Sequence, residues 1–225
     1  MSDVTNNSRS EKPPGAGSSS IDLIDIDLFF KALALKPGIS VVDLGSGPGD
    51  YSIPIATVIG SEGRVYAVDL WQGCVEFLQS EIVRLGIVNI EPILADMSKR
   101  LPFEGDSIDA CLMATILHDL KDNQSHDAAL TEVKRILKKG GIFAVVEFTK
   151  RDGPPGPPAS IRLSPEETTM LVEPHGFTRK GLYDLGPCTS LVIYSNTYRV
   201  TPRPPADRMI QDENPGSENI LDNKL

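Results

Sequence analysis

Residues 41–50, VVDLGSGPGD, join a short run of β-branched residues to three alternating glycines. The apolar start is typical of a buried strand. Glycine adopts backbone conformations that other residues avoid, and it lets the main chain pass close to a ligand before a helix begins. The pattern therefore predicts a strand, a tight turn and a helix, the arrangement that binds nucleotides in open α/β sheets.

Two acidic positions indicate which kind of nucleotide fits this turn. A dinucleotide fingerprint that begins at Gly45 requires a third glycine at position 50, where this chain has Asp50. Asp43 lies just before the first glycine, where its negative charge would repel a pyrophosphate. A cationic ligand reverses the sign of that interaction. S-adenosylmethionine (SAM) has no phosphate and carries an ammonium and a sulfonium group, so these residues favour SAM over NAD.

Two further acids follow the next two predicted strands. Asp69 ends the strand 64–68, twenty residues beyond the last glycine of the turn, where a carboxylate can accept from both ribose hydroxyls of an adenosine. Asp96 follows the apolar run 93–95 and is placed to accept from an adenine amino group. Because the carboxyl ends of neighbouring parallel strands share one crevice, we expect these two acids and Asp43 to surround one ligand.

These residues, together with two later motifs, resemble the class I SAM-dependent methyltransferases. The later motifs are LPF and SIDA within 101–110, and LKKGGIF at 137–143, where Lys139 replaces the usual proline. The resemblance covers roughly residues 35–148, about half of the chain, and points to the branch with the ubiquinone and menaquinone methyltransferases, the type 11 group. It implies a Rossmann-like α/β fold with a seven-stranded mixed sheet, helices on both faces, an antiparallel last strand and SAM as the cofactor.

The resemblance also implies a set of cofactor-binding residues at the turn and at the ends of the first four strands. Tyr51 is expected beside the methionine part of SAM and Trp71 near the edge of the adenosine. For each of these two, ordinary packing is an equally good alternative. The predicted set is Asp43, Gly45, Ser46, Gly47, Gly49, Tyr51, Asp69, Leu70, Trp71, Asp96, Met97 and Thr115.

His118 and Glu147 are the candidate catalytic residues. His118 follows the predicted strand 108–114, whose carboxyl end faces the same crevice as Asp43, and Glu147 lies in the predicted strand 142–148. A neutral imidazole can take a proton from a hydroxyl, an amine or an activated carbon as a methyl group is transferred. The alternative is that His118 hydrogen-bonds to the loop backbone and shapes the cleft.

A segment rich in proline and glycine, RDGPPGPPA at 151–159, follows the fifth predicted strand. It can form neither a helix nor a central strand, and we expect it to be one wall or lid of the substrate pocket. Arg162 comes soon after it and is a candidate to bind an anionic substrate group. The alternative is a surface arginine on a solvated linker. His118 is the second substrate-binding candidate.

Capping and breaker signals place the other elements. Ser164 and Glu167 form a capping box at the start of a helix. Two apolar runs, 180–185 and 191–198, are separated by too few residues for a crossover and predict an antiparallel hairpin. Periodicity and stop signals predict four further helices. One spans 21–35, one is capped by Asp50 and ends at Gly60, one contains Phe77, Leu78, Ile82 and Leu85 and is closed by Gly86, and one spans 124–138.

The composition suits one α/β domain, since the chain has 225 residues of which 40% are hydrophobic. We expect that domain to span residues 21–200, between a polar disordered tail at 1–20 and a flexible acidic tail at 201–225. The net charge of −9 argues against a nucleic-acid partner. No apolar run is long enough for a membrane span and no signal-peptide pattern is present, which predicts a cytoplasmic protein. The three cysteines lack metal-ligand spacing, so no metal is expected.

The expected function is transfer of the sulfonium methyl of SAM to a small-molecule acceptor by direct displacement, with positioning supplying much of the rate. The acceptor atom stays open among O, N, S and C, and the oligomeric state stays open as well. Two other classes are kept as alternatives: a SAM-binding regulatory or partner protein without turnover, and a protein methyltransferase. An NAD-linked reductase fits the fold but conflicts with Asp43 and Asp50.

Overall fold

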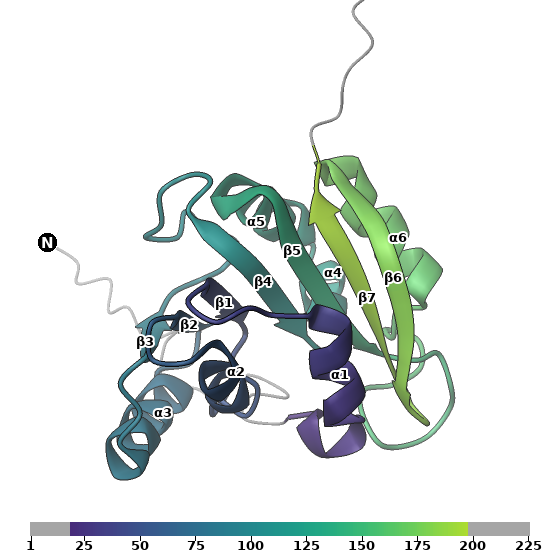
Figure 1. Ribbon diagram of the computed structural model, residues 1–225. Coiled ribbons are helices and arrows are strands. Elements are labelled where there is room, and N and C mark those ends of the chain that lie inside the picture. Colours follow the sequence, from purple (N-terminus) through teal and green to yellow (C-terminus); the bar gives the residue numbers. More distant parts are fainter. Residues whose placement is uncertain (1–18, 198–225) are drawn as a thin grey trace, which may run out of the picture.

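A computed structural model describes residues 19–197 of the chain. Its centre is a seven-stranded sheet in the order β3-β2-β1-β4-β5-β7-β6 (Figure 1). The first five strands are parallel, and β7 is inserted antiparallel between β5 and β6. This confirms the predicted mixed sheet and its antiparallel last strand. The strands are β1 (Ser40–Leu44), β2 (Arg64–Asp69), β3 (Ile90–Leu94), β4 (Ile108–Ala114), β5 (Leu137–Phe148), β6 (Phe177–Gly186) and β7 (Thr189–Asn196).

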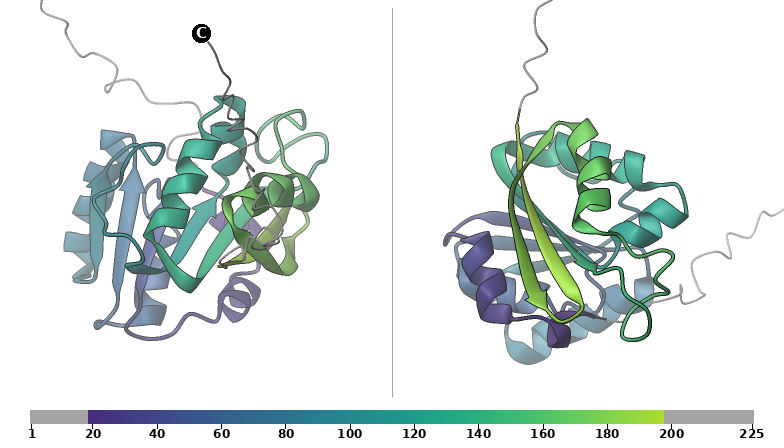
Figure 2. Two further views of the ribbon diagram at one scale, coloured as in Figure 1. Left: turned by 90° about the horizontal axis from the view of Figure 1, so that it is seen from above. Right: turned by 90° about the vertical axis from the view of Figure 1, so that its right-hand side faces the viewer.

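Helices cover both faces of the sheet (Figures 1 and 2). One buried apolar cluster joins one face of the sheet to α1 (Ile26–Leu33), α2 (Ser52–Ile59) and α3 (Gln72–Leu85). A second cluster joins the opposite face to α4 (Leu117–Asp122), α5 (His126–Ile136) and α6 (Pro165–Val172). Two short 3₁₀ turns, η1 (Ile21–Leu23) and η2 (Glu173–His175), complete the fold.

The N-terminal helix is shorter than predicted. The expected helix over 21–35 is divided into η1 and α1, because Asp25 leaves the helical conformation and its side chain accepts the Leu28 N–H at 2.9 Å as an N-cap. Ala34 ends α1 in the left-handed conformation, at φ 48°. The predicted cap at Asp50 is also wrong, because α2 begins after Tyr51 and has no side-chain cap.

The boundary between α5 and β5 differs from the prediction as well. The chain leaves α5 at Ile136, not at Lys138, and β5 begins directly at Leu137. Gly140 and Gly141 therefore lie inside the strand, at a register irregularity against β4. A Cβ at position 141 would lie 2.8 Å from the Lys138 carbonyl oxygen, so only glycine fits this bend.

The C-terminal elements agree with their sequence signals. Ser164 and Glu167 form the predicted capping box of α6, since each side chain accepts the backbone N–H of the other residue. The hairpin of β6 and β7 is present: β6 is longer than the predicted run 180–185, and β7 begins and ends two residues before the predicted run 191–198. Tyr198, the predicted end of the hairpin, and both predicted tails beyond residues 19–197 lie outside the described residues.

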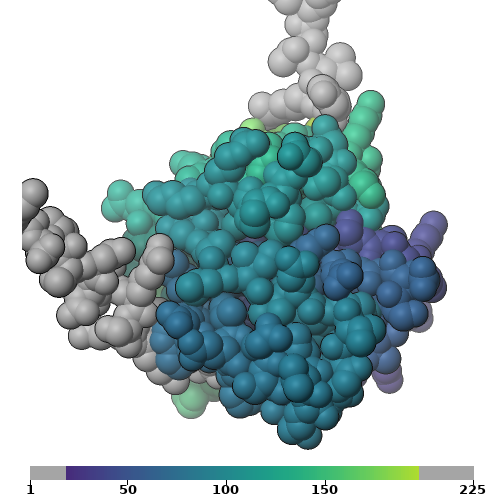
Figure 3. All heavy atoms as spheres, turned by 90° about the vertical axis from the view of Figure 1, so that its left-hand side faces the viewer, coloured from purple at the N-terminus to yellow at the C-terminus, as the bar shows by residue number. Residues whose placement is uncertain are grey.

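Edge strand β3 and helix α3 form the face shown in Figure 3. Several apolar side chains are exposed here, among them Phe77 and Val83. Pro92 lies within β3 and cannot donate a hydrogen bond to a further strand. The edge is therefore poorly suited to extension of the sheet.

Within residues 19–197, none of the helices combines the length and the apolar character that a membrane span requires. The same part of the chain contains no group of three or more His, Cys, Asp or Glu side chains arranged to hold a metal ion. All three cysteines are free and buried.

Candidate active site

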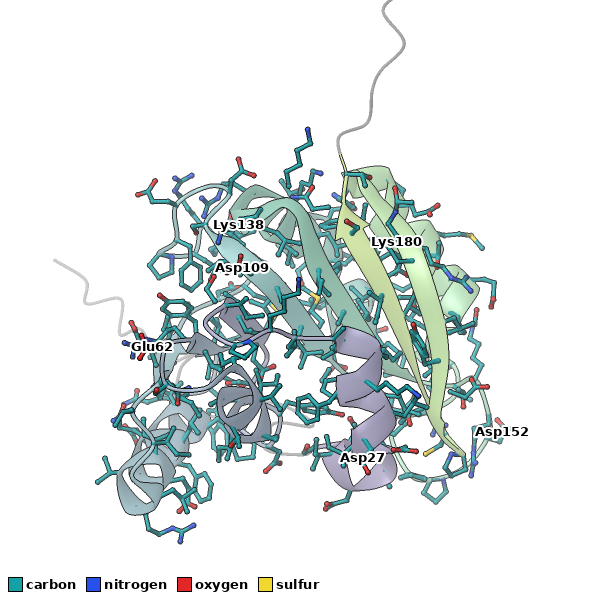
Figure 4. The ribbon with its side chains drawn as sticks, viewed as in Figure 1. Asp27, Glu62, Asp109, Lys138, Asp152 and Lys180 are labelled. Atoms are coloured by element: carbon teal, nitrogen blue, oxygen red, sulfur yellow. The ribbon has the colours of Figure 1, made fainter. Side chains whose placement is uncertain are left out.

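The parallel strands bring the predicted site residues to the carboxyl-terminal ends of the strands, on the lower side of the sheet in Figure 1. Leu44, the last residue of β1, pairs with Val68 of β2 on one side and with Met113 of β4 on the other. The glycine turn after β1, Asp69 at the end of β2 and the residues after β4 are therefore neighbours. Lys138 and Asp109 form an ion pair at 2.6 Å and lie on the opposite side, near the amino-terminal ends of the strands (Figure 4).

The glycine turn is held by backbone hydrogen bonds and by close packing. The N–H groups of Gly45 and Ser46 both donate to the Val68 carbonyl oxygen, at 2.8 and 3.1 Å. A Cβ at Gly49 would lie 2.4 Å from a methyl group of Leu78, whereas a Cβ at Gly47, where φ is +54°, would meet nothing within 4 Å. The turn thus packs on α3 on one side and keeps its backbone bare on the other. That bare side is where a ligand can approach.

Asp69 connects the end of β2 to this turn. Its Oδ2 accepts the Gly47 N–H and its Oδ1 accepts the Trp71 N–H, both at 2.8 Å. Each carboxylate oxygen keeps further acceptor capacity, as the hydroxyls of a ribose require. Asp96 accepts the backbone N–H and the hydroxyl of Ser98 through Oδ1 alone. Among the described residues its Oδ2 has no hydrogen-bond donor, which suits an adenine amino group.

Asp43 is buried behind the turn, with 1% of its surface exposed. Its Oδ2 accepts the Ser52 hydroxyl at 2.6 Å. Burial raises the pKa of Asp43 to about 7; the hydrogen bond from Ser52 opposes this shift, and the charges of Asp69 and Asp50 add to it. A cation beside the turn would offset that burial cost and favour the ionised carboxylate. The residues at the turn, at Asp69 and at Asp96 therefore fit a ligand with the charge and the hydrogen-bonding groups of SAM.

The remaining residues of the predicted cofactor set vary in exposure. Leu70 is 54% exposed at the edge of the crevice, and Met97 is buried beside the turn. Thr115 has φ +54°, and its N–H donates to the Val146 carbonyl oxygen. Within this set, Leu70 is therefore exposed to solvent and Met97 belongs to the buried core.

Tyr51 and Trp71 have packing partners within the protein. The Tyr51 hydroxyl hydrogen-bonds to the Ser20 hydroxyl at 2.8 Å, and its ring lies 5.5 Å from that of Phe29. Burial raises the pKa of Tyr51. The Trp71 ring lies against Gly73, where a Cβ would be 2.7 Å from it. The contacts of Tyr51 agree with the packing interpretation, whereas the Trp71 contact is with the first turn of α3 and not with the sheet. For both residues, contact with SAM stays a prediction.

His118 and Glu147 form a buried pair beside this crevice. Glu147 comes from β5 and His118 from the first turn of α4. The His118 Nδ1 lies 2.7 Å from Glu147 Oε2, and the His118 backbone N–H donates to Oε1 at 3.1 Å. With Glu147 ionised, Nδ1 carries the proton and Nε2 keeps its lone pair. The partner of His118 is thus a carboxylate rather than the loop backbone of the alternative interpretation.

The charges around His118 raise its pKa. Burial alone lowers that pKa, but the hydrogen bond to Glu147 and the charges of Glu147 and Asp119 outweigh the effect, while the charge of Arg162 opposes them. Asp119 Oδ1 lies 3.4 Å from His118 Nε2. The imidazole is therefore both oriented and made more basic, as a general base requires.

Arg162 lies in a different environment from either prediction. Its side chain is 1% exposed, so it is not a surface arginine. Its guanidinium donates to four backbone carbonyls of the segment before it, so the structure offers no support for an anionic substrate group as its partner.

Three residues near the site were missed in the sequence. The Ser20 hydroxyl hydrogen-bonds to the Tyr51 hydroxyl, and Ser52 donates to Asp43. Asp119 lies beside His118. Only Asp119 carried a signal, as a second titratable group directly after His118. The two serines act through contacts that no local pattern reveals.

The fold and the arrangement of these residues are those of the class I SAM-dependent methyltransferases. Comparison with known proteins supports the same family. Residues 41–141 match the family model "Methyltransferase domain". The chain is 31% identical over 115 residues to the ubiquinone/menaquinone biosynthesis C-methyltransferase UbiE of Shewanella sp. (strain W3-18-1), and 32% identical over 122 residues to UbiE of Xanthomonas oryzae pv. oryzae (strain MAFF 311018). These matches cover 51% and 54% of this chain, and 45% and 47% of the relatives. The chain thus spans about half the length of the curated relatives it matches.

Solved structures extend the likeness beyond that region. A SAM-dependent methyltransferase from Aquifex aeolicus aligns with a TM-score of 0.72 and 25% identity, over 83% of this chain and 95% of that one. A geranyl diphosphate methyltransferase in complex with SAM shares the fold, with a TM-score of 0.60 and 18% identity over 76% of this chain and 84% of that one. The chain therefore contains a class I SAM-dependent methyltransferase domain, and SAM is the cofactor of that domain.

Proposed function

We propose that this protein methylates a small-molecule acceptor by direct displacement, with His118 as the general base and Glu147 as the residue that positions it. The observation that carries the proposal is the 2.7 Å hydrogen bond between His118 Nδ1 and Glu147 Oε2. A buried imidazole held by a carboxylate, next to the crevice that fits SAM, is an arrangement for removing a proton where a methyl group is delivered.

The residues have separate tasks in this mechanism. Bound SAM supplies an electrophilic methyl group on its sulfonium. The glycine turn and Asp69 hold the adenosine and methionine parts, with Asp43 as the buried negative charge. Glu147 keeps the proton on Nδ1, so that Nε2 of His118 can accept the proton of a hydroxyl or amine as that atom takes the methyl group. The imidazolium so formed is stabilised by Glu147.

A small acceptor is supported by the charge of the protein and by the names of its relatives. The net charge of −9 disfavours nucleic acid as the substrate. The matched UbiE relatives are named as C-methyltransferases of ubiquinone and menaquinone biosynthesis. The cytoplasmic location predicted from the sequence belongs to this proposal too.

The proposal is tested by incubating the protein with SAM and a panel of phenols, catechols, amines and hydroquinones while S-adenosylhomocysteine (SAH) is measured. We expect SAH formation with members of one acceptor class, and loss of that turnover in His118→Ala. Binding of SAM without turnover across the panel would indicate the regulatory alternative. Transfer of labelled methyl groups to proteins alone would indicate the protein methyltransferase.

A further inference from the structure

Arg162 is among the largest side chains that the described fold buries almost completely. A guanidinium taken out of water requires hydrogen-bond acceptors for its N–H groups. All of its acceptors are backbone carbonyls of the segment between β5 and Arg162. Nε donates to Pro157 at 2.8 Å, Nη1 to Thr149 at 3.3 Å, and Nη2 to Gly153 and Pro155 at 2.7 and 2.8 Å.

The composition of the segment explains this choice of partner. Residues 149–161 include four prolines, which have no N–H group and keep the segment out of a helix or sheet, so most of its carbonyls do not receive the donors that those structures would supply. The guanidinium presents five N–H donors in a fixed plane and can gather several carbonyls at once. Lysine cannot reproduce this fork, because its ammonium is a single point with three donors.

Phe148 and two surface contacts complete the attachment. The guanidinium carbon of Arg162 lies 5.5 Å from the centroid of the Phe148 ring. Gly156 lies against the same ring, because a Cβ there would be 2.7 Å from it, at φ +94°. Outside the segment's core, Lys150 pairs with Glu167 at 2.5 Å and Arg151 donates to a carbonyl of the β6–β7 turn. The segment is therefore fastened at its centre and at its beginning.

This segment lies beside the proposed base. It begins directly after β5, which carries Glu147, and the charge of Arg162 is near enough to lower the pKa of His118. Asp152, a residue of this segment, lies on the lower side of the molecule, the side on which the parallel strands end (Figure 4). We propose that Arg162 is a positioning residue that holds segment 149–161 as a fixed wall of the acceptor pocket, and that this wall selects the acceptor. The selection part of this inference rests on the function proposed above.

The attachment can be tested without any acceptor. Limited trypsin digestion reports release of the wall, since Lys150 and Arg151 are exposed cleavage sites at its beginning. We expect Arg162→Met to increase cleavage there at least tenfold, Arg162→Lys to give an intermediate increase, and Gly156→Ala to increase cleavage with the arginine retained. Arg84→Met, which alters an exposed arginine on α3, is the matched control and should leave cleavage unchanged.

A second readout follows His118 itself. The three histidines allow its ring signals to be assigned by NMR and titrated. Its neighbouring charges are Glu147 on β5, Asp119 on α4 and Arg162. Removing the arginine in Arg162→Met should raise the pKa of His118, whereas Arg162→Lys should rescue most of that change. A role in folding alone would not produce this difference.

Turnover then tests selection. We expect Arg162→Lys and Gly156→Ala to raise the KM for the acceptor at least tenfold, with a smaller change in kcat and a Kd for SAM within twofold of wild type. Unchanged cleavage in folded Arg162→Met or Arg162→Lys would overturn the attachment. Increased cleavage with an unchanged acceptor KM would overturn the selection. If the wild-type protein has no turnover, the proposed function fails and selection with it, while cleavage and titration still decide the attachment.

Discussion

The two halves of the sheet differ in how their functional residues are brought together. In the half formed by β1, β2 and β3, the cofactor residues follow one another closely: a turn comes after β1, Asp69 is the last residue of β2, and Asp96 follows β3. In the half formed by β4, β5 and the hairpin, the important contacts join distant positions. His118 and Glu147 are 29 residues apart, and their pairing depends on β4 and β5 lying side by side.

This difference shows why the cofactor was easier to predict than the acceptor. The cofactor half is built from motifs that each fold locally, so the same turn can hold the same ligand in many proteins. The acceptor half is built from long-range pairs and from a loop attached through one arginine. Each of these can change without disturbing the cofactor site, and we expect mutations to separate the two halves in the same way.

The largest effect is expected in the cofactor half. Asp69→Ala removes both acceptor oxygens, and Gly47→Val places a side chain on the bare side of the turn at a positive φ. Each should weaken SAM binding roughly a thousandfold, since charge-assisted hydrogen bonds are lost or blocked. Isothermal titration calorimetry measures this directly. Glu62→Ala, an exposed acid in the turn before β2, is the control, and tight SAM binding by both site variants would refute the assignment.

The acceptor half should respond in rate and not in cofactor affinity. His118→Ala and Glu147→Gln should each lower kcat by about a hundredfold and leave the Kd for SAM nearly unchanged. Because the pKa of His118 is raised above its ordinary value of 6.5, the wild-type rate should fall on the acid side with a midpoint above that value. Glu147→Gln removes the charge that raises the pKa, so its midpoint should move to lower pH. An unmoved pH profile would exclude His118 as the base.

Asp43 should affect the stability of the fold, and the size of that effect should depend on pH. Its pKa is 3.8 as an ordinary carboxyl and about 7 in the fold, so its contribution to stability is present below pH 3.8 and is lost as the pH rises through 7. Asp43→Asn does not titrate. Without SAM, it should therefore gain stability relative to wild type between pH 4 and 8, by up to roughly 4 kcal/mol. Urea unfolding at both pH values measures the gain, and a constant difference would contradict the buried-acid interpretation.

The smallest effect concerns the contact between Ser20 and Tyr51. Both side chains are buried, and a single hydrogen bond of 2.8 Å joins them. A double-mutant cycle with Ser20→Ala and Tyr51→Phe should give a coupling of about 1 kcal/mol in urea unfolding. If Tyr51 instead contacts SAM, Tyr51→Phe will weaken SAM binding more than it lowers stability, and the packing interpretation will have to be replaced.

The sequence predicted the parts of the fold whose signals are local. Strand ends after β-branched runs, the glycine turn, the capping box at Ser164 and the short gap of the hairpin each depend on neighbouring residues, and the structure agrees with them. The helix over 21–35 failed because its apolar spacing continued through Asp25, which caps a new helix instead. The His118–Glu147 hydrogen bond and the surroundings of Arg162 could not be predicted, because both depend on which distant segments meet.

The central claim is that the glycine turn and the acids around it bind SAM. The most direct test is thermal unfolding of the wild-type protein with SAM, SAH or NAD, each in large excess. A ligand at about a hundred times its Kd adds roughly 2.7 kcal/mol of stability, so we predict raised unfolding midpoints with SAM and SAH and an unchanged midpoint with NAD. A midpoint raised by NAD alone, or by none of the three in protein that unfolds cooperatively, would contradict the account.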